Sequence, residues 1–206
     1  MKLFLLLLSL LFISSSYAES VRPERYIVVG VSGFGTRRPE NAWQPSAVHE
    51  RLPSHYRIEN SYKLVHFAKQ SEVNEVLEEF QCHDGKQNRK DLGLIIMANS
   101  WGSSKALKLA KKYSKLCGRS SDLFFMIDGV RKPLFANGTK PKAQQCFSFY
   151  QRKGLVRGKA IKGCTNVDFT KKCNDMGYGA VNCHIYVEWE GARRASQLVN
   201  RFLKNQ

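Results

Sequence analysis

Three consecutive segments in the middle of the chain alternate between a strand pattern and a helix pattern, and this alternation limits the possible folds most. Residues 92–97 (LGLIIM) and 123–127 (LFFMI) are short, unbroken apolar runs. Such runs are typical of strands that are buried on both faces of a parallel sheet. Between them, residues 105–113 (KALKLAKKY) place alanine and leucine at helical spacing. A strand, a helix and a second strand in this order favour a βαβ unit.

Other segments extend the same pattern. Residues 25–31 form another apolar, β-branched run, and residues 62–68 form a weaker one, so both are expected to be strands. Helices are expected over residues 71–80 and 192–204, where apolar side chains recur every three or four positions. We therefore expect an α/β fold in which helices flank a mostly parallel central sheet.

Two regions give weaker signals. A polar stretch that contains Trp43, Val48 and Leu52 is expected to form a helix that is interrupted near Pro53. The long region 129–183, rich in Gly, Lys, Asn and Cys, is expected to hold short strands and loops pinned by disulfides.

The first residues have the organisation of a secretory signal peptide. Lys2 is followed by an apolar run over residues 3–13 and by Ser16-Tyr17-Ala18, a small-x-small cleavage site. The alternative is an N-terminal membrane anchor, for which this run is too short. We expect a signal peptide over residues 1–18 and one domain over residues 19–206, secreted or periplasmic.

The cysteine count agrees with export. An even number of cysteines in an exported chain favours disulfides, although six cysteines allow many pairings. Cys82 and Cys117 are expected to pair, because Cys82 follows one helix, Cys117 ends another, and both helices are expected to run toward the same edge of the sheet. The adjacent pairs Cys82-His83 and Cys183-His184 are poor metal sites, since neighbouring residues rarely point at one ion. No metal is expected.

The chain is strongly basic, with 33 Lys and Arg against 17 Asp and Glu, a net charge of +16. The positive residues are scattered, and no aromatic-interleaved recognition motif accompanies them, so no specific nucleic-acid partner is expected. Peripheral attraction to anionic surfaces is consistent with this charge. The sequence does not define the oligomeric state.

A candidate nucleophile lies between the strongest strand and the strongest helix. Ala98-Asn99-Ser100-Trp101-Gly102 matches small-x-Ser-x-Gly, the pattern of a nucleophile elbow. Small residues two positions before and after the serine relieve crowding in a sharp turn, and the helix N-terminus favours negative charge there. The pattern alone is common, but the strand and helix around it provide the required context. Ser100 is the predicted nucleophile.

A serine nucleophile needs a base, and the chain has five histidines. His66 lies inside an expected strand, His49 and His55 lie in a polar stretch, and His83 lies in a charged loop. His184 comes late in the chain, just before the expected terminal helix, where a Ser–acid–His order places the base.

The acid that orients the histidine is expected at the end of a strand. Asp128 ends the run 123–127, so its carboxylate is expected at the same sheet edge as Ser100. Asp168, between Cys164 and Cys173, is the alternative acid, and Asp175 is a further rival.

The oxyanion hole is expected from two backbone N–H groups. The glycine-rich turn over residues 30–36 follows the first strand and allows the N–H of Phe34 to face a developing oxyanion. Trp101, directly after the nucleophile, supplies the second N–H.

These motifs together resemble the α/β-hydrolase superfamily, in particular small bacterial secreted lipases and esterases. Val-Ser-Gly-Phe-Gly (residues 31–35) resembles their oxyanion loop, Ala-Asn-Ser-Trp-Gly (residues 98–102) their elbow, and Met-Ile-Asp-Gly-Val (residues 126–130) a strand that ends in the acid. The resemblance also covers the segments 146–151 and 155–168, which precede the histidine.

The resemblance implies a serine hydrolase that cleaves a small-molecule or lipid ester through an acyl-enzyme and needs no cofactor. Ser32, Asn99 and Ser103 depart from the family pattern, and the short chain leaves little or no room for a lid. Two alternatives stay open: an inactive hydrolase-fold binding protein, or a basic exported protein that binds nucleic acid or cell-wall polymers. The substrate and its acyl-chain length are not defined.

Overall fold

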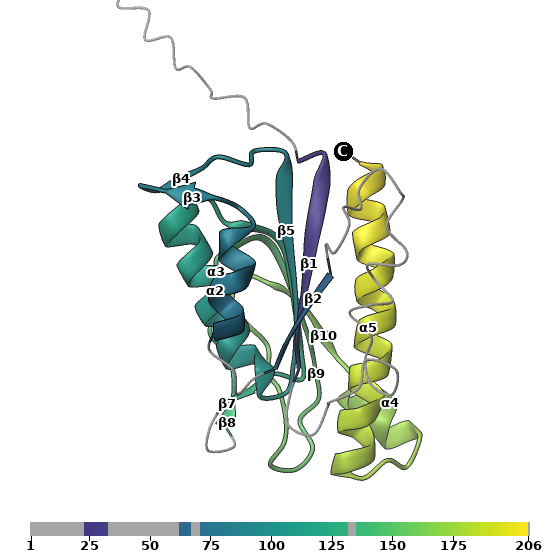
Figure 1. Ribbon diagram of the computed structural model, residues 1–206. Helices are drawn as coiled ribbons and strands as arrows, with labels where there is room; N and C mark the ends of the chain where they lie inside the picture. The colour runs from purple at the N-terminus through teal and green to yellow at the C-terminus, as the bar shows by residue number, and fades with distance from the viewer. Residues whose placement is uncertain (1–22, 33–61, 67–70, 132–134, 206) are drawn as a thin grey trace, which may run out of the picture.

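A six-stranded parallel sheet forms the centre of the protein, in a computed structural model that describes residues 23–32, 62–66, 71–131 and 135–205 (Figure 1). The strands lie in the order β2-β1-β5-β6-β9-β10, and each adjacent pair is parallel. The predicted α/β class, with helices flanking a parallel sheet, is confirmed. The strands are β1 (Arg25–Ser32), β2 (Tyr62–His66), β5 (Leu92–Asn99), β6 (Ser121–Ile127), β9 (Ala143–Tyr150) and β10 (Thr165–Asp168).

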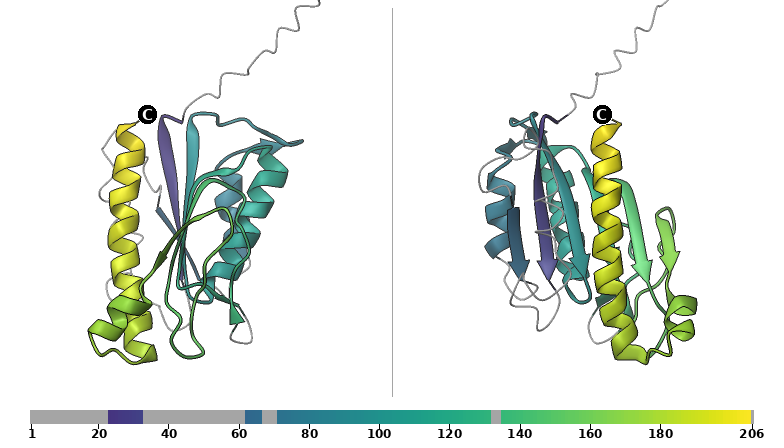
Figure 2. Two further views of the ribbon diagram at one scale, coloured as in Figure 1. Left: turned by 180° about the vertical axis from the view of Figure 1, so that it is seen from behind. Right: turned by 90° about the vertical axis from the view of Figure 1, so that its right-hand side faces the viewer.

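Helices cover both faces of this sheet, as Figures 1 and 2 show. Helices α2 (Ser71–Glu78) and α3 (Gly102–Cys117) lie on one face. The long helix α5 (Ala180–Lys204) crosses the other face, and the short helix α4 (Thr170–Asp175) lies beside its first turns. Two two-stranded hairpins complete the described elements: β3 (Cys82–His83) with β4 (Lys86–Gln87), and β7 (Val130–Arg131) with β8 (Phe135–Ala136).

The two-sided cover explains why residues 92–97 are apolar at every position. Leu94 and Ile96 pack into the core on the α3 side, whereas Ile95 and Met97 pack into the core on the α5 side. Because successive side chains of a strand point to opposite faces, a strand covered on both faces has no exposed position that a polar residue could occupy.

The order of the strands reverses between β1 and β5. The chain continues from β1 to β2 on one side and then from β5 through β10 on the other side. In open parallel sheets, ligands bind at the carboxyl ends of the strands where the order reverses. These ends lie where α4 and the first turns of α5 are found (Figure 2).

Two expectations for the second half of the chain agree with the structure only in part or not at all. The region 129–183 contains an eight-residue strand, β9, inside the sheet as well as short strands and loops. The terminal helix begins at Ala180 and not at residue 192, so His184 lies inside the helix and not before it. The helix expected around Trp43, Val48 and Leu52 lies outside the described residues.

Three disulfides link separate elements of the described structure. Cys82–Cys117 links the β3–β4 hairpin to the end of α3, as predicted, and Cys146–Cys164 joins β9 to the loop before β10. Cys173–Cys183 fastens α4 to the first turn of α5. Disulfides of this kind are typical of proteins in an extracellular or other oxidising environment.

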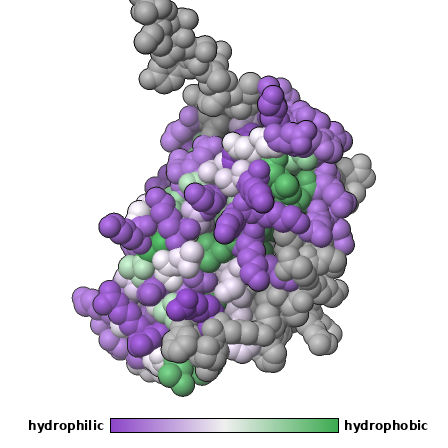
Figure 3. Space-filling view, turned by 90° about the vertical axis from the view of Figure 1, so that its left-hand side faces the viewer, coloured by the Kyte–Doolittle hydropathy of each residue, from purple (hydrophilic) through white to green (hydrophobic). Residues whose placement is uncertain are grey.

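The surface over α2 and α3 is mainly hydrophilic, with small separate apolar areas (Figure 3). Helix α3 exposes four lysines on this side: Lys108, Lys111, Lys112 and Lys115. Over the described ranges, no helix combines the length and the hydropathy that crossing a bilayer requires.

Candidate functional site

Ser100 lies in a strained turn between β5 and α3. Its φ is 45°, in the left-handed region that residues other than glycine rarely adopt. Two backbone hydrogen bonds to the neighbouring segment hold the turn: the Ser100 N–H donates to the Ile127 carbonyl (3.0 Å), and the Val130 N–H donates to the Ser100 carbonyl (2.9 Å). Ser100 therefore lies beside the end of β6, and it is 9% exposed.

Asp128, directly after β6, is fully buried and also has a positive φ, 42°. Three donors from the segment after β9 hold its carboxylate: the Gln151 N–H (3.2 Å) and the Gly158 N–H (2.5 Å) at Oδ1, and Gln151 Nε2 (2.9 Å) at Oδ2. A Cβ at Gly158 would lie 2.8 Å from Oδ1, so only glycine allows this approach. These bonds compensate for the loss of hydration and fix the carboxylate in one orientation.

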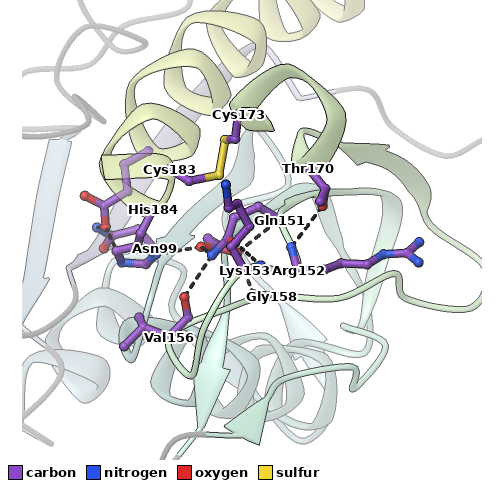
Figure 4. A network of polar contacts seen from close by, with 12 residues as sticks. Asn99, Gln151, Arg152, Lys153, Val156, Gly158, Thr170, Cys173, Cys183 and His184 are labelled. Atoms are coloured by element: carbon purple, nitrogen blue, oxygen red, sulfur yellow. Dashed lines mark hydrogen bonds and ion pairs between the residues drawn. A yellow bond between two sulfur atoms is a disulfide. The ribbon is translucent and has the colours of Figure 1, made fainter. Parts of the chain in front are cut away.

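His184, on the second turn of α5, donates from Nδ1 to Oδ2 of Asp128 at 2.6 Å (Figure 4). The adjacent Cys183 is bound to Cys173 of α4, which limits movement of this end of the helix. The bond to Asp128 leaves Nε2 as the ring nitrogen that is available to other groups.

A second carboxylate lies on the other side of the imidazole. Glu188, one turn further along α5, places Oε1 3.4 Å from Nε2 of His184, and the same oxygen accepts a hydrogen bond from Nδ2 of Asn99 at 2.7 Å. Asn99 immediately precedes Ser100, so the contacts run from Asp128 through His184 and Glu188 to the turn that contains Ser100. Within the described residues, the Ser100 hydroxyl makes no hydrogen bond to His184.

The two carboxylates change the protonation of the histidine. Burial alone would lower the pKa of His184, but the hydrogen bonds with Asp128 and Glu188 outweigh this effect and raise the pKa to about 9. Near neutral pH the imidazole is therefore positively charged and lies between two carboxylates.

The other predicted residues are placed as follows. Trp101 lies between Ser100 and the first residue of α3, with helical φ and ψ, so its N–H is at the helix N-terminus. Phe34 and the glycine-rich turn after residue 32 lie outside the described residues. Asp168 is not a partner of His184: it ends β10, bonds to Arg152 at 2.9 Å and accepts from Thr170. Asp175 is exposed at the end of α4.

Three residues of this site were not predicted from the sequence: Gln151, Gly158 and Glu188. Gln151 has a recognisable signal, because it is a polar residue directly after the apolar run of β9, at the same sheet edge as Asp128. Glu188 follows His184 by four positions, which is one helical turn, but this relation is visible only if the helix begins before His184.

No protein-family model, no curated protein and no solved structure matches this chain. In the part of the chain that the structure describes, no group of three or more His, Cys, Asp or Glu side chains is arranged so that it could hold a metal ion.

Proposed function

We propose that the protein is a serine hydrolase that cleaves carboxylic esters, with Ser100 as nucleophile, His184 as general base and Asp128 as the residue that orients the base. One observation carries this proposal: a buried Asp128 holds Nδ1 of His184 at 2.6 Å, at the strand end that flanks the strained turn of Ser100. The position at the reversal of strand order adds support. The resemblance to small secreted lipases and esterases agrees with this chemistry.

In the proposed reaction, Nε2 of His184 accepts the Ser100 proton while the serine oxygen attacks the ester carbonyl. The carbonyl carbon becomes tetrahedral, and its oxygen takes up negative charge near the N-terminus of α3. The Trp101 N–H is the donor assigned to this oxygen, and such a donor contributes about 3 kcal/mol. The protonated His184 then donates its proton to the leaving alcohol. Water attacks the acyl-enzyme with the help of the same base.

Glu188 sets a condition on this mechanism. Its carboxylate faces Nε2, the atom that must receive the Ser100 proton, and it favours the charged imidazole that cannot accept one. Catalysis therefore requires that His184 loses its proton and that the contact between Nε2 and Glu188 opens. Catalytic hydrogen bonds often tighten only when the substrate binds.

The same contact favours the second candidate, a hydrolase-like scaffold that binds a ligand without cleaving it. In that case the bond between Glu188 and His184 is permanent, and Ser100 is an ordinary turn residue. A fluorophosphonate probe separates the two functions, because it reacts only with an activated serine. Covalent labelling that requires Ser100 and His184 supports the hydrolase, and a folded protein that stays unlabelled supports the scaffold.

A further inference from the structure

A groove lies between α5 and the strands β9 and β10, on the face of the sheet that α5 crosses. It consists of two hollows of about 370 and 260 Å³, which share Phe147, Leu198 and Arg201 in their linings. The larger hollow has the size of small-molecule sites in proteins.

Strand β10 is short, and among the described residues it lines only the larger hollow. Its four residues pair only with the second half of β9, Phe147 to Tyr150. Gln145, Phe147 and Phe149 alternate along β9 with intervening residues, so they point to the same face of the sheet, toward α5. The first half of β9 has no pairing with β10, and the smaller hollow lies there, between β9 and the last turns of α5.

The lining combines an apolar floor with positive charge. Phe147, Phe149 and Val167 come from the strands, and Leu198 and Phe202 come from the helix. Three arginines of α5 (Arg193, Arg194 and Arg201) also line the larger hollow, and none of the described residues of either lining carries a carboxylate side chain.

The arginines differ in their existing partners. Arg194 donates to Glu190 at 3.0 Å and lies 5.0 Å above the ring of Phe169, and Arg193 also pairs with Glu190. Arg201 is exposed and forms no ion pair with another described residue. It lies seven positions after Arg194, two turns along the same side of the helix. An anionic group in the groove would therefore meet Arg201 first.

We propose that this groove binds a free, medium-chain carboxylate, with its head group on Arg201 and its hydrocarbon tail against Phe147, Leu198 and Phe202. A guanidinium group binds a carboxylate through two parallel hydrogen bonds, and the apolar floor gains from covering the tail. Arg201 follows His184 by 17 positions in α5, about 25 Å along the helix axis. The groove is therefore separate from the serine site and does not depend on its activity.

The test is calorimetric titration of the oxidised protein with decanoate below its micelle concentration, with thermal unfolding as a second measurement. We expect saturable binding and a higher melting temperature, because a ligand that binds only the folded state stabilises it. Arg201→Gln should weaken binding about tenfold to a hundredfold, and Arg201→Lys should weaken it less. Lys111→Gln removes one positive charge from the opposite face and should leave binding unchanged.

Four results would overturn the proposal. The first is equal affinity for decanol and decanoate, because it would mean that the arginines do not recognise the carboxylate head group. The second is equal affinity for acetate and decanoate, because acetate lacks the hydrocarbon tail. An equal loss of affinity in Arg201→Gln and Lys111→Gln, or binding to anionic vesicles without binding to free decanoate, would also exclude this site.

Discussion

The imidazole of His184 and the carboxylate of Asp128 are joined by a 2.6 Å hydrogen bond, although 56 positions separate the two residues in the sequence. Asp128 reaches this position at the end of a buried strand, and His184 reaches it on the first turns of the long helix that crosses the sheet. The pair depends on the docking of α5 onto the sheet, so it reports directly on the tertiary structure.

Replacement of Glu188 by glutamine should lower the pKa of His184. In the parent protein this pKa is raised to about 9, so at pH 7 only about one molecule in a hundred has a neutral base. Ester hydrolysis by the parent should therefore rise with pH up to about 9, and in Glu188→Gln this rise should occur at lower pH. The pKa can be measured without substrate by NMR titration of the His184 ring.

Glu190→Gln is the matched control for this titration. Glu190 lies on the same helix but pairs with Arg193 and Arg194, so its loss should leave the His184 midpoint in place. An unchanged midpoint in Glu188→Gln would show that Glu188 does not act on the imidazole. The raised pKa of His184 also affects stability. Below pH 6.5, the ordinary pKa of histidine, the ion pairs of His184 stabilise the fold fully, and this stabilisation is lost as the pH rises through about 9.

Asp128→Asn should abolish most of the activity, whereas Asp168→Asn should not. The amide cannot stabilise the imidazolium that forms during catalysis, and in serine hydrolases such a change costs about 10⁴-fold in kcat. Asp168 bonds to Arg152 at an exposed position and does not contact His184. The comparison uses initial rates on a short-chain ester. Equal rates in the two variants would remove Asp128 from the mechanism.

Loss of the Cys173–Cys183 disulfide should reduce activity at temperatures where the protein is still folded. Replacement of both cysteines by alanine frees the start of α5, which carries His184, and should also lower the free energy of unfolding by about 2–4 kcal/mol. Replacement of Cys82 and Cys117 costs similar stability but lies far from the histidine. Near-UV circular dichroism identifies the temperature range in which both variants are folded. If both lose activity equally within this range, the disulfide has no positioning role.

Gln151→Leu should destabilise the protein by about 1–3 kcal/mol, because it removes a donor from the buried carboxylate of Asp128. Gln144→Leu removes a similar bond to Asp122, but from an exposed side chain, and should change stability by about 0.5 kcal/mol or less. Urea unfolding measures both differences. A small effect of Gln151→Leu would mean that the backbone donors alone satisfy Asp128.

The central strands could be predicted because burial on both faces leaves a simple signal. Every residue of β5 and β6 is buried, so their segments contain almost only apolar residues. Strand β9 has a weaker signal, since its first residues are exposed and include Gln144 and Gln145. Its buried half also contains Ser148, whose hydroxyl is satisfied by the Lys159 carbonyl.

The beginning of α5 could not be predicted from an apolar stripe. Near its start the buried positions include Cys183, Val187 and Gly191, whereas the apolar side chains of Val181, Ile185 and Trp189 are exposed. Gly191 is required there because a Cβ would lie 2.8 Å from Ile127. Because the sequence predicts this helix only from residue 192, it does not place His184 and Glu188 one turn apart on a helix. Their contact is therefore a part of the candidate site that could not be predicted.

The central claim is that Ser100 is activated by His184, and intact-mass measurement of fluorophosphonate labelling tests it most directly. The parent protein, oxidised and without residues 1–18, should gain one adduct, faster near pH 9 than near pH 7. Ser100→Ala and His184→Ala should gain none, whereas the exposed His83→Ala should label like the parent. A parent protein that is folded by circular dichroism and stays unlabelled at both pH values would contradict the account.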